Sequence, residues 1–174
     1  MTDSTRPGAA AAAVALPPRR AAESATEMVQ VVLPNDANPL GFILGGTVMH
    51  LIDITGAIAC HRHSRSLLVT AAVDGLQFLH PIKVGDLVIL RARVTATFQT
   101  SLEVMVEVLS EEIQTGTRRM TSVAYLTFVT IDRDGKRCPV PPLLLETDAE
   151  RQRAAEAEVR RQARLEAKKR LISA

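Results

Sequence analysis

Residues 47–63, TVMHLIDITGAIACHRH, form the only long helical candidate in the body of the chain, and the segments around them decide the fold. A short β-branched stretch, MVQVVL at 28–33, comes before, and the turn-rich loop PNDANPLGFILGG at 34–46 joins the two. Four strand-like stretches follow, at 67–79, 86–98, 102–113 and 118–131, with turn formers between them. One strand, one helix and then hairpin-linked strands predict an α+β fold with an antiparallel sheet.

The two ends of the chain differ in composition from this body, which spans residues 26–145. Residues 1–25 are rich in Ala and Pro and predict a disordered tail. Residues 146–174 mix acids, bases and alanines, and Thr147 with Glu150 has capping-box spacing, so we expect a charged C-terminal helix. Its few apolar residues form no stripe, which favours a solvated helix, lying on or off the body, over a coiled-coil or RNA-binding arm. On this interpretation both tails are dispensable for folding and activity.

Composition excludes several classes of protein. The chain has 174 residues, enough for one domain with tails, and 47% of them are hydrophobic. Its 21 basic and 19 acidic residues leave a net charge of +2, and it has no Trp and one Tyr, which argues against nucleic-acid binding. The apolar runs are shorter than the roughly 20 residues of a membrane helix. Cys60 and Cys138 make neither a disulfide framework nor a zinc site, so we expect a cytoplasmic protein.

Asp53 is the unusual residue of the candidate helix, because most of the helix circumference is apolar, as expected for a helix wrapped by a sheet. At 100° per residue, its side of the helix also carries small and polar residues: Gly46, Met49, His50, Gly56, Ala57 and Cys60. A buried carboxylate needs either a partner or a function, and the pattern favours a functional role over a purely structural one. The free amides of Gly45 and Gly46 at the helix start could polarise a carbonyl, with Asp53 as general base or nucleophile.

Other chemically active side chains carry weaker signals. His61 and His63 lie about 200° apart on a helix and cannot share a metal. His50 could hydrogen-bond Asp53, and Cys60 is best interpreted as a small buried residue. The sequence DRDG at 132–135 lacks the glutamate that a calcium loop requires and is interpreted as a turn.

The hairpin joining residues 86–98 to 102–113 has a register that follows from its alternation of apolar and polar residues. Apolar residues must face apolar residues, and a three-residue turn at 99–101 satisfies this condition. The predicted cross-strand pairs are Arg93 with Glu107, Thr97 with Glu103, and Val94 with Val106.

A series of short motifs runs through the body in a characteristic order. They are LPNDANPLG at 33–41, GG at 45–46, Met49, ID at 52–53, VTA at 69–71, FLHPI at 78–82, VGD at 84–86, FV at 128–129 and VPP at 140–142. Together they resemble the YciA-like acyl-CoA thioesterases of the hotdog superfamily, over roughly residues 28–150. The resemblance implies a sheet curled around the central helix and paired across a homodimer, often with three dimers in a hexamer.

The same resemblance implies an activity and a set of site residues. The activity is hydrolysis of acyl-CoA to a free carboxylic acid and CoA, with CoA as part of the substrate and with no cofactor and no metal. Asp53 matches the family's catalytic carboxylate, and Gly45 and Gly46 match the glycines whose amides polarise the thioester carbonyl. The residues assigned to substrate binding are Asn38, Phe42, Lys83, Thr100 and Ser101.

Two positions depart from the family pattern. Phe42 stands where many members have Asn, Asp or Thr, and the turn Phe98-Gln99-Thr100-Ser101 keeps only the serine of Gly-Arg-x-Ser. The arginine that could meet the CoA phosphates is therefore missing, and Lys83, Arg118 and Arg119 are the candidates to replace it. These departures keep open a second hypothesis, a hotdog protein that binds acyl-CoA without turnover. A hotdog dehydratase is disfavoured, because no histidine lies in the loop before the helix.

Overall fold

The computed structural model describes residues 16–173, so residues 1–15 of the predicted disordered tail lie outside the described residues. The elements are β1 (Arg19–Arg20), α1 (Ala21–Ser24), β2 (Thr26–Val31), the 3-10 turn η1 (Pro34–Asp36), α2 (Gly45–Ser64), β3 (Leu67–Asp74), β4 (Leu87–Thr97), β5 (Ser101–Glu111), β6 (Arg118–Ile131), β7 (Leu143–Leu144) and α3 (Asp148–Ile172). The predicted central helix and all five predicted strands are present. Strand β3 is shorter than expected, because the chain leaves the sheet at Gly75, where φ is +60°.

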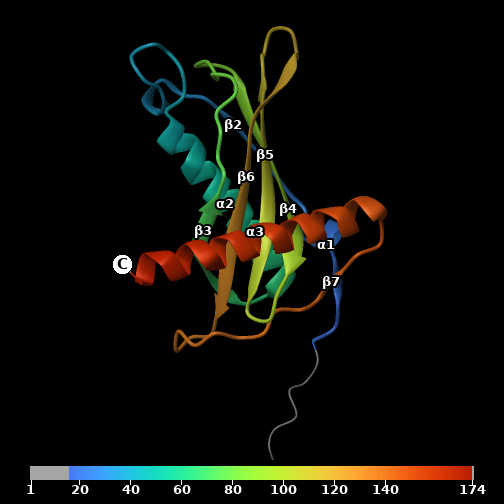
Figure 1. Ribbon diagram of the computed structural model, residues 1–174. Coiled ribbons are helices and arrows are strands. Elements are labelled where there is room, and N and C mark those ends of the chain that lie inside the picture. The colour runs from blue at the N-terminus through green and yellow to red at the C-terminus, as the bar shows by residue number, and fades with distance from the viewer. Residues whose placement is uncertain (1–15, 174) are drawn as a thin grey trace, which may run out of the picture.

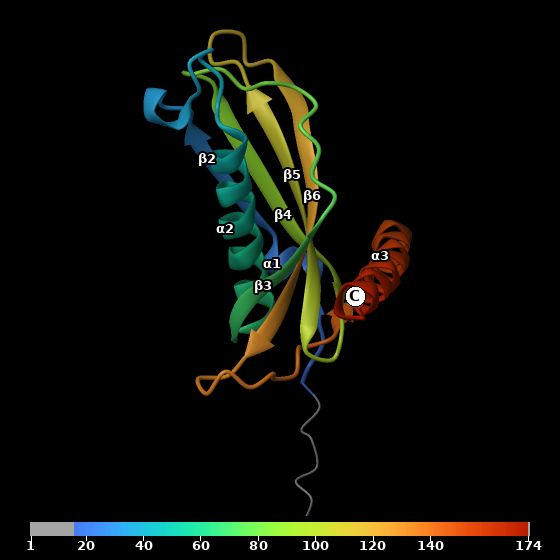
Figure 2. The same ribbon diagram turned by 60° about the vertical axis from the view of Figure 1, so that its left-hand side comes forward.

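Three layers make up the body of the molecule (Figures 1 and 2). The middle layer is a five-stranded antiparallel sheet in the order β2-β4-β5-β6-β3, so β2 and β3 are its edge strands. Helix α2 covers one face, here called the inner face, and α3 crosses the opposite, outer face (Figure 2). The predicted α+β architecture around a central helix is therefore confirmed.

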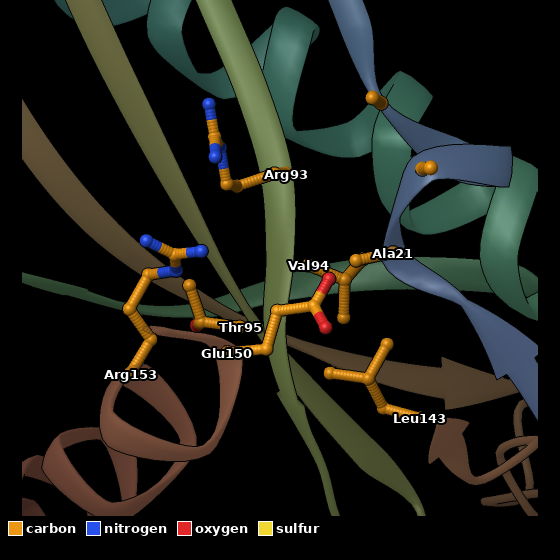
Figure 3. Close-up of a pocket in the computed structure, with 9 residues that line it drawn as sticks. Ala21, Arg93, Val94, Thr95, Leu143, Glu150 and Arg153 are labelled. Carbon is orange, nitrogen blue, oxygen red and sulfur yellow. The ribbon is translucent and has the colours of Figure 1, made fainter. Parts of the chain in front are cut away.

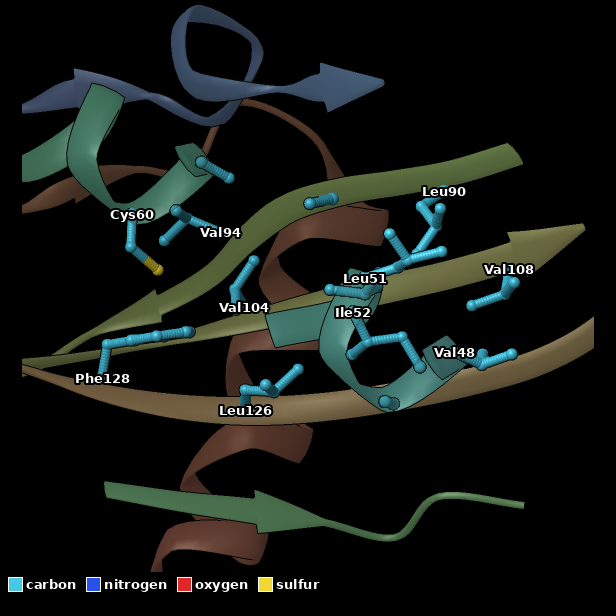
Figure 4. Packing of buried hydrophobic residues seen from close by; sticks show 14 of the residues in the cluster. Val48, Leu51, Ile52, Cys60, Leu90, Val94, Val104, Val108, Leu126 and Phe128 are labelled. Atoms are coloured by element: carbon cyan, nitrogen blue, oxygen red, sulfur yellow. The ribbon is translucent and has the colours of Figure 1, made fainter. Parts of the chain in front are cut away.

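The core lies between α2 and the inner face of the sheet (Figure 4). Val48, Leu51 and Ile52 of α2 pack among buried sheet residues that include Leu90, Val94, Val104, Leu126 and Phe128. Gly56 lets the helix approach closely, because a Cβ there would lie 3.1 Å from Cγ1 of Val104. Among the helices described between residues 16 and 173, none combines the length and the apolar character required to cross a bilayer.

The open face of α2 is narrower than the sequence predicts. Gly56 and Cys60 were expected beside Asp53 on that face, but both are buried against the sheet, Cys60 completely. The curled sheet covers a wider arc of the helix than a flat one would, and residues 52, 56, 59 and 60 fall within that arc. Burial raises the pKa of the Cys60 thiol, which therefore stays protonated, in keeping with a packing role.

The expectation of a disordered tail up to residue 25 is wrong for residues 16–25. Strand β1 pairs in parallel with β7, and Ala21 and Ser24 of α1 are buried. The guanidinium of Arg62 at the end of α2 donates to the carbonyl of Ala25 at 3.0 Å and to Oγ1 of Thr26 at 2.9 Å. Strand pairing, buried side chains and hydrogen bonds to distant parts of the chain order this segment, and local composition does not reveal them.

The hairpin register also differs from the prediction. Arg91 pairs with Glu107, Arg93 with Met105 and Val94 with Val104, two residues away from the expected register. A β-bulge between Val94 and Ala96 then shifts the pairing again, and Ala96 faces Glu103. Either register places apolar residues opposite apolar residues, so the alternation alone does not fix the pairing of the two strands. The turn and the bulge determine which register forms.

Helix α3 lies on the outer face of the sheet, held there by polar contacts that its sequence does not reveal. Glu103 has no exposed surface, because Arg160 of α3 binds both its carboxylate oxygens, at 2.8 and 3.1 Å. Oγ1 of Thr95 donates to the same carboxylate at 2.7 Å, and the Arg160 guanidinium lies 3.8 Å from the ring centroid of Tyr125. The helix docks through arginines rather than through an apolar stripe, so the expectation that it is dispensable has no support in these contacts.

We expect Arg160→Ala to lower the free energy of unfolding by about 3 kcal/mol, because it leaves the buried Glu103 carboxylate without its cation. Urea denaturation followed by circular dichroism measures this change. Arg170→Ala, in the last turn of α3, is the matched control and should change stability by less than about 0.5 kcal/mol. Adding Glu103→Gln to Arg160→Ala should restore part of the loss. Equal stability of the two arginine variants would contradict the structural role of the pair.

A second buried polar group, His63, predicts a pH dependence. Burial lowers the pKa of His63, while a hydrogen bond between Nε2 and the Pro141 carbonyl, at 3.0 Å, opposes this shift. Nδ1 has no partner among the described residues. Because the folded pKa lies below the unfolded value near 6.5, protons bind the unfolded chain first, and stability falls as the pH drops below about 6.5.

We therefore expect the unfolding free energy of the wild type to fall more than that of His63→Gln between about pH 7.5 and about pH 5.5. Denaturant titrations at the two pH values measure the difference. His61→Gln, an exposed histidine at the same helix end, should keep the wild-type slope. A His63→Gln slope equal to the wild-type slope would show that His63 does not titrate in this range.

Candidate active site

Asp53 lies in the third turn of α2, half-buried at the border of the open helix face. Oγ1 of Thr70 donates a hydrogen bond to its Oδ1 at 2.7 Å. Thr70 is the last residue of β3 before a shift in the register with β6, on an edge strand of the sheet. One carboxylate oxygen is thus held by the strand, which orients the other oxygen for chemistry.

The start of α2 supplies backbone donors. No side chain caps this helix at its N-cap residue, Leu44, so the first amides of the helix are free to bind a ligand. A Cβ on Gly45 would lie 3.4 Å from the ring of Phe78, whereas a Cβ on Gly46 would meet nothing within 4 Å. Gly46 therefore faces open space in a single chain, where a ligand or a second chain can come close.

A cavity of about 300 Å³, here called the helix-start cavity, lies beside Gly45. Its walls are mainly apolar and come from the loop before α2, the segment after β3 and the start of β6: Asn38, Phe42, Ile43, Gly45, Val48, Phe78, Leu79, His80, Pro81, Ile82, Thr121 and Ser122. Oδ1 of Asn38 accepts from the amides of Leu40 at 3.0 Å and Phe42 at 3.3 Å, which fixes this loop and leaves Nδ2 for a ligand. Asn38, Phe42 and Gly45, all predicted site residues, are brought together here.

The helix-start cavity does not include Asp53. Eight residues separate Gly45 from Asp53 along α2, which is about 12 Å at 1.5 Å per residue. A nucleophile and the donors to a carbonyl oxygen must both lie about 3 Å from the reacting group. This spacing along the axis disfavours the simplest interpretation, in which the glycines and the carboxylate of one chain act on the same carbonyl.

Other predicted substrate-binding residues lie elsewhere. Lys83 forms an isolated β-bridge with Phe42, but it lines a separate polar cavity of about 160 Å³ together with Arg119, Asp86 and Glu112. Thr100 and Ser101 line a cavity of about 530 Å³ on the outer face of the sheet, under α3. A further cavity, of about 240 Å³ between α1, β4 and the start of α3, contains none of the predicted site residues (Figure 3).

Two residues that the sequence did not single out belong to this region. Thr70 holds Asp53, and Phe78 packs against the helix start. Both lie within the motifs at residues 69–71 and 78–82, so the motifs marked the segments without assigning the side chains. Only the fold shows that a threonine 17 positions away from Asp53 in the sequence lies next to it.

The thioesterase superfamily model matches residues 40–117 of the chain. The uncharacterized acyl-CoA thioester hydrolase YkhA of Bacillus subtilis is 39% identical over 128 residues, covering 74% of this chain and 74% of its own. The chain belongs to the thioesterase superfamily. The acyl-CoA thioester hydrolase YciA of Salmonella typhimurium is 35% identical over 114 residues, 64% of this chain and 86% of its own, which confirms the predicted resemblance. Other relatives are longer: this thioesterase-superfamily chain spans 38% of the cytosolic acyl coenzyme A thioester hydrolase of Rattus norvegicus.

Solved structures confirm the hotdog fold of this superfamily member. An acyl-CoA hydrolase from Bacillus cereus superposes with a TM-score of 0.82 at 31% identity, covering 90% of this chain and 97% of the other. The Staphylococcus aureus acyl-CoA hydrolase, solved with butyryl coenzyme A and coenzyme A, superposes with a TM-score of 0.82 at 33% identity. The superposition covers 90% of this chain and 98% of the other. A hexameric acyl-CoA thioesterase superposes with a TM-score of 0.83 at 36% identity, covering 87% of this chain and 97% of the other.

The Staphylococcus aureus hydrolase has also been solved as three single alanine variants, of an asparagine, an aspartate and a threonine. These three residues occur in that chain in the same order, and at the same separations, as Asn38, Asp53 and Thr70 here. The set that the present structure singles out by geometry thus matches, in residue type and spacing, a set chosen for substitution in a relative.

Proposed function

We propose that this protein hydrolyses acyl-CoA thioesters to a free carboxylic acid and CoA. The observation that carries the proposal is the Asp53 carboxylate, held at Oδ1 by Thr70 on the open face of α2. A carboxylate fixed at one oxygen is suited to activate water as a general base or to attack the thioester carbonyl itself. The names of its relatives support the same activity. That the reaction needs no cofactor beyond the substrate stays a prediction.

The 12 Å between the helix start and Asp53 favours a site shared by two copies of the chain. In such a site, Gly45, Gly46 and Asn38 of one copy hold the thioester carbonyl, while Asp53 and Thr70 of the other deliver the base or nucleophile. Met49, on the open face of α2, is 48% exposed, and Val73 of the edge strand β3 is 47% exposed, so both present apolar surface for a second copy. The free edge of β3 offers backbone hydrogen bonds for the same contact.

We further propose that three such dimers assemble into a hexamer. The acyl-CoA thioesterase that is 36% identical and an additional relative, the thioesterase y2039 from Yersinia pestis, are both hexameric. A cytoplasmic location remains a prediction from the composition of the chain.

Asp53→Asn should reduce the rate of thiol release from butyryl-CoA by at least about 10²-fold, the contribution expected of a positioned base. The amide keeps an oxygen to accept from Thr70 but lacks the negative charge, so the free energy of unfolding should change by less than about 0.5 kcal/mol. Thr70→Val should slow turnover by about tenfold, whereas Thr70→Ser keeps the hydroxyl and should stay close to wild type. Full turnover by the Asp53→Asn variant would end the catalytic assignment. If the wild-type protein binds butyryl-CoA but releases no thiol, the non-catalytic alternative is favoured.

Complementation between subunits tests the shared site. Asn38→Asp keeps the oxygen that fixes the loop but replaces the free amide, so it should inactivate the protein without unfolding it. Mixing Asp53→Asn and Asn38→Asp chains after reversible dissociation should restore about a quarter of wild-type activity, because half of the dimers then carry one intact site. A mixture no more active than its components would show that each chain builds its own site.

A further inference from the structure

The outer face of the sheet carries a cavity that the proposed chemistry does not use. It has a volume of about 530 Å³, and its floor comes from β3, β6 and the turn between β4 and β5, while α3 forms its roof. Ion pairs hold this roof in place at two points, between Arg160 and Glu103 on β5 and between Arg164 and Asp74 at the end of β3. We call it the α3 cavity.

The α3 cavity is strongly basic. Four of its lining residues are cationic, namely Arg137, Arg161, Arg164 and Lys168, and none is acidic. Arg164 is neutralised by Asp74, and Arg161 lies 3.3 Å from Glu158 in a solvent-exposed pair, which is a weak interaction. Arg137 and Lys168 form no ion pair with any described residue. The net charge facing the cavity is therefore positive, and it suits a ligand with several negative charges, such as a phosphate.

Polar and aromatic groups in the same cavity further restrict the class of ligand that it can bind. Thr127 is 5% exposed, and its Oγ1 has no hydrogen-bond partner among the described residues, an unusual state for a buried hydroxyl. Thr100 and Ser101 add two hydroxyls at the rim. The guanidinium of Arg161 lies 4.5 Å from the ring centroid of Phe98, and together they offer flat surfaces on which a nucleobase can stack.

The basic residues considered from the sequence are less suitable. Arg118 is paired with Glu111, and Lys83 and Arg119 share their small cavity with the carboxylates of Asp86 and Glu112. Charge in that cavity is balanced, so it offers little attraction to a phosphate. The α3 cavity contains Thr100 and Ser101, beside the position where the arginine of the turn is missing.

From these observations we infer that the α3 cavity binds the phosphorylated adenosine end of acyl-CoA, with Arg161 and Lys168 of α3 and Arg137 as its phosphate-binding residues. The inference rests on the proposed function, because acyl-CoA is the ligand. It assigns to the C-terminal helix a role in substrate binding that is separate from the bond-breaking chemistry at Asp53.

The test uses the full-length protein and a probe without a thioester, adenosine 3′,5′-bisphosphate. The test variant is the double charge reversal Arg137→Glu with Lys168→Glu, at two exposed positions of the cavity. The matched control, Arg133→Glu with Lys169→Glu, makes the same change in net charge on the same loop and helix but outside the cavity. Isothermal titration calorimetry measures the binding of the bisphosphate and of butyryl-CoA, the latter in the Asp53→Asn background, where it is not consumed.

We expect the test variant to bind both ligands at least about tenfold more weakly than the parent protein, and the control variant less than about twofold more weakly. The bisphosphate should compete with butyryl-CoA for binding. In turnover assays the KM of the test variant should rise by a similar factor while kcat stays within about twofold. Equal effects of the two double variants would overturn the inference, and so would bisphosphate binding that does not compete with butyryl-CoA, since this would indicate a separate nucleotide site. Failure of the proposed function is distinguishable, because it would abolish thiol release while leaving these binding results intact.

Discussion

Close packing of α2 against the inner face of the sheet is the constraint on which the rest of the molecule depends. Gly56 places the helix so near β5 that an added Cβ would stand 3.1 Å from Val104. The same helix carries Asp53, whose Oδ1 accepts from Oγ1 of Thr70 on β3 at 2.7 Å. The rise of a helix also places residues 45 and 53 about 12 Å apart along the axis of α2, whatever the surrounding packing.

That fixed spacing links catalysis to assembly. In one chain, the helix start and its apolar cavity lie at one end of α2, and the carboxylate lies two turns further on. In the proposed two-copy site, a monomer of this fold holds both halves of a thioesterase site but not one complete site. The exposed apolar residues of α2 and the open edge of β3 are the surfaces through which two copies can supply complementary halves. On that proposal, oligomerisation serves the chemistry as well as covering apolar surface.

The outer face of the sheet is covered through polar contacts rather than through apolar packing. It is covered by a helix with almost no apolar contact surface, held by arginines that reach a fully buried carboxylate on β5 and an aspartate on β3. A buried ion pair adds little net stability compared with apolar packing, but it fixes the position of the helix, because displacement would strand Glu103 without its cation. The same arrangement leaves further basic side chains of α3 facing a cavity, where they are available to a phosphate-bearing ligand.

The sequence alone determined the fold class and the central helix, and it marked Asp53 and the loop before α2 as the candidate site, because these depend on local periodicity and on short motifs. It could not determine the hairpin register, since two registers place apolar residues together equally well and a bulge at residues 94–96 decides between them. It also missed the ordered segment at 16–25, the burial of Glu103 and the docking of α3, since each depends on contacts, several of them polar, between residues far apart in the chain. The periodicity of the sequence indicates which residues avoid water. It does not indicate the partner of an individual charge or hydroxyl, because only the tertiary structure brings the two groups together, as it does for Thr70 with Asp53 and Arg160 with Glu103.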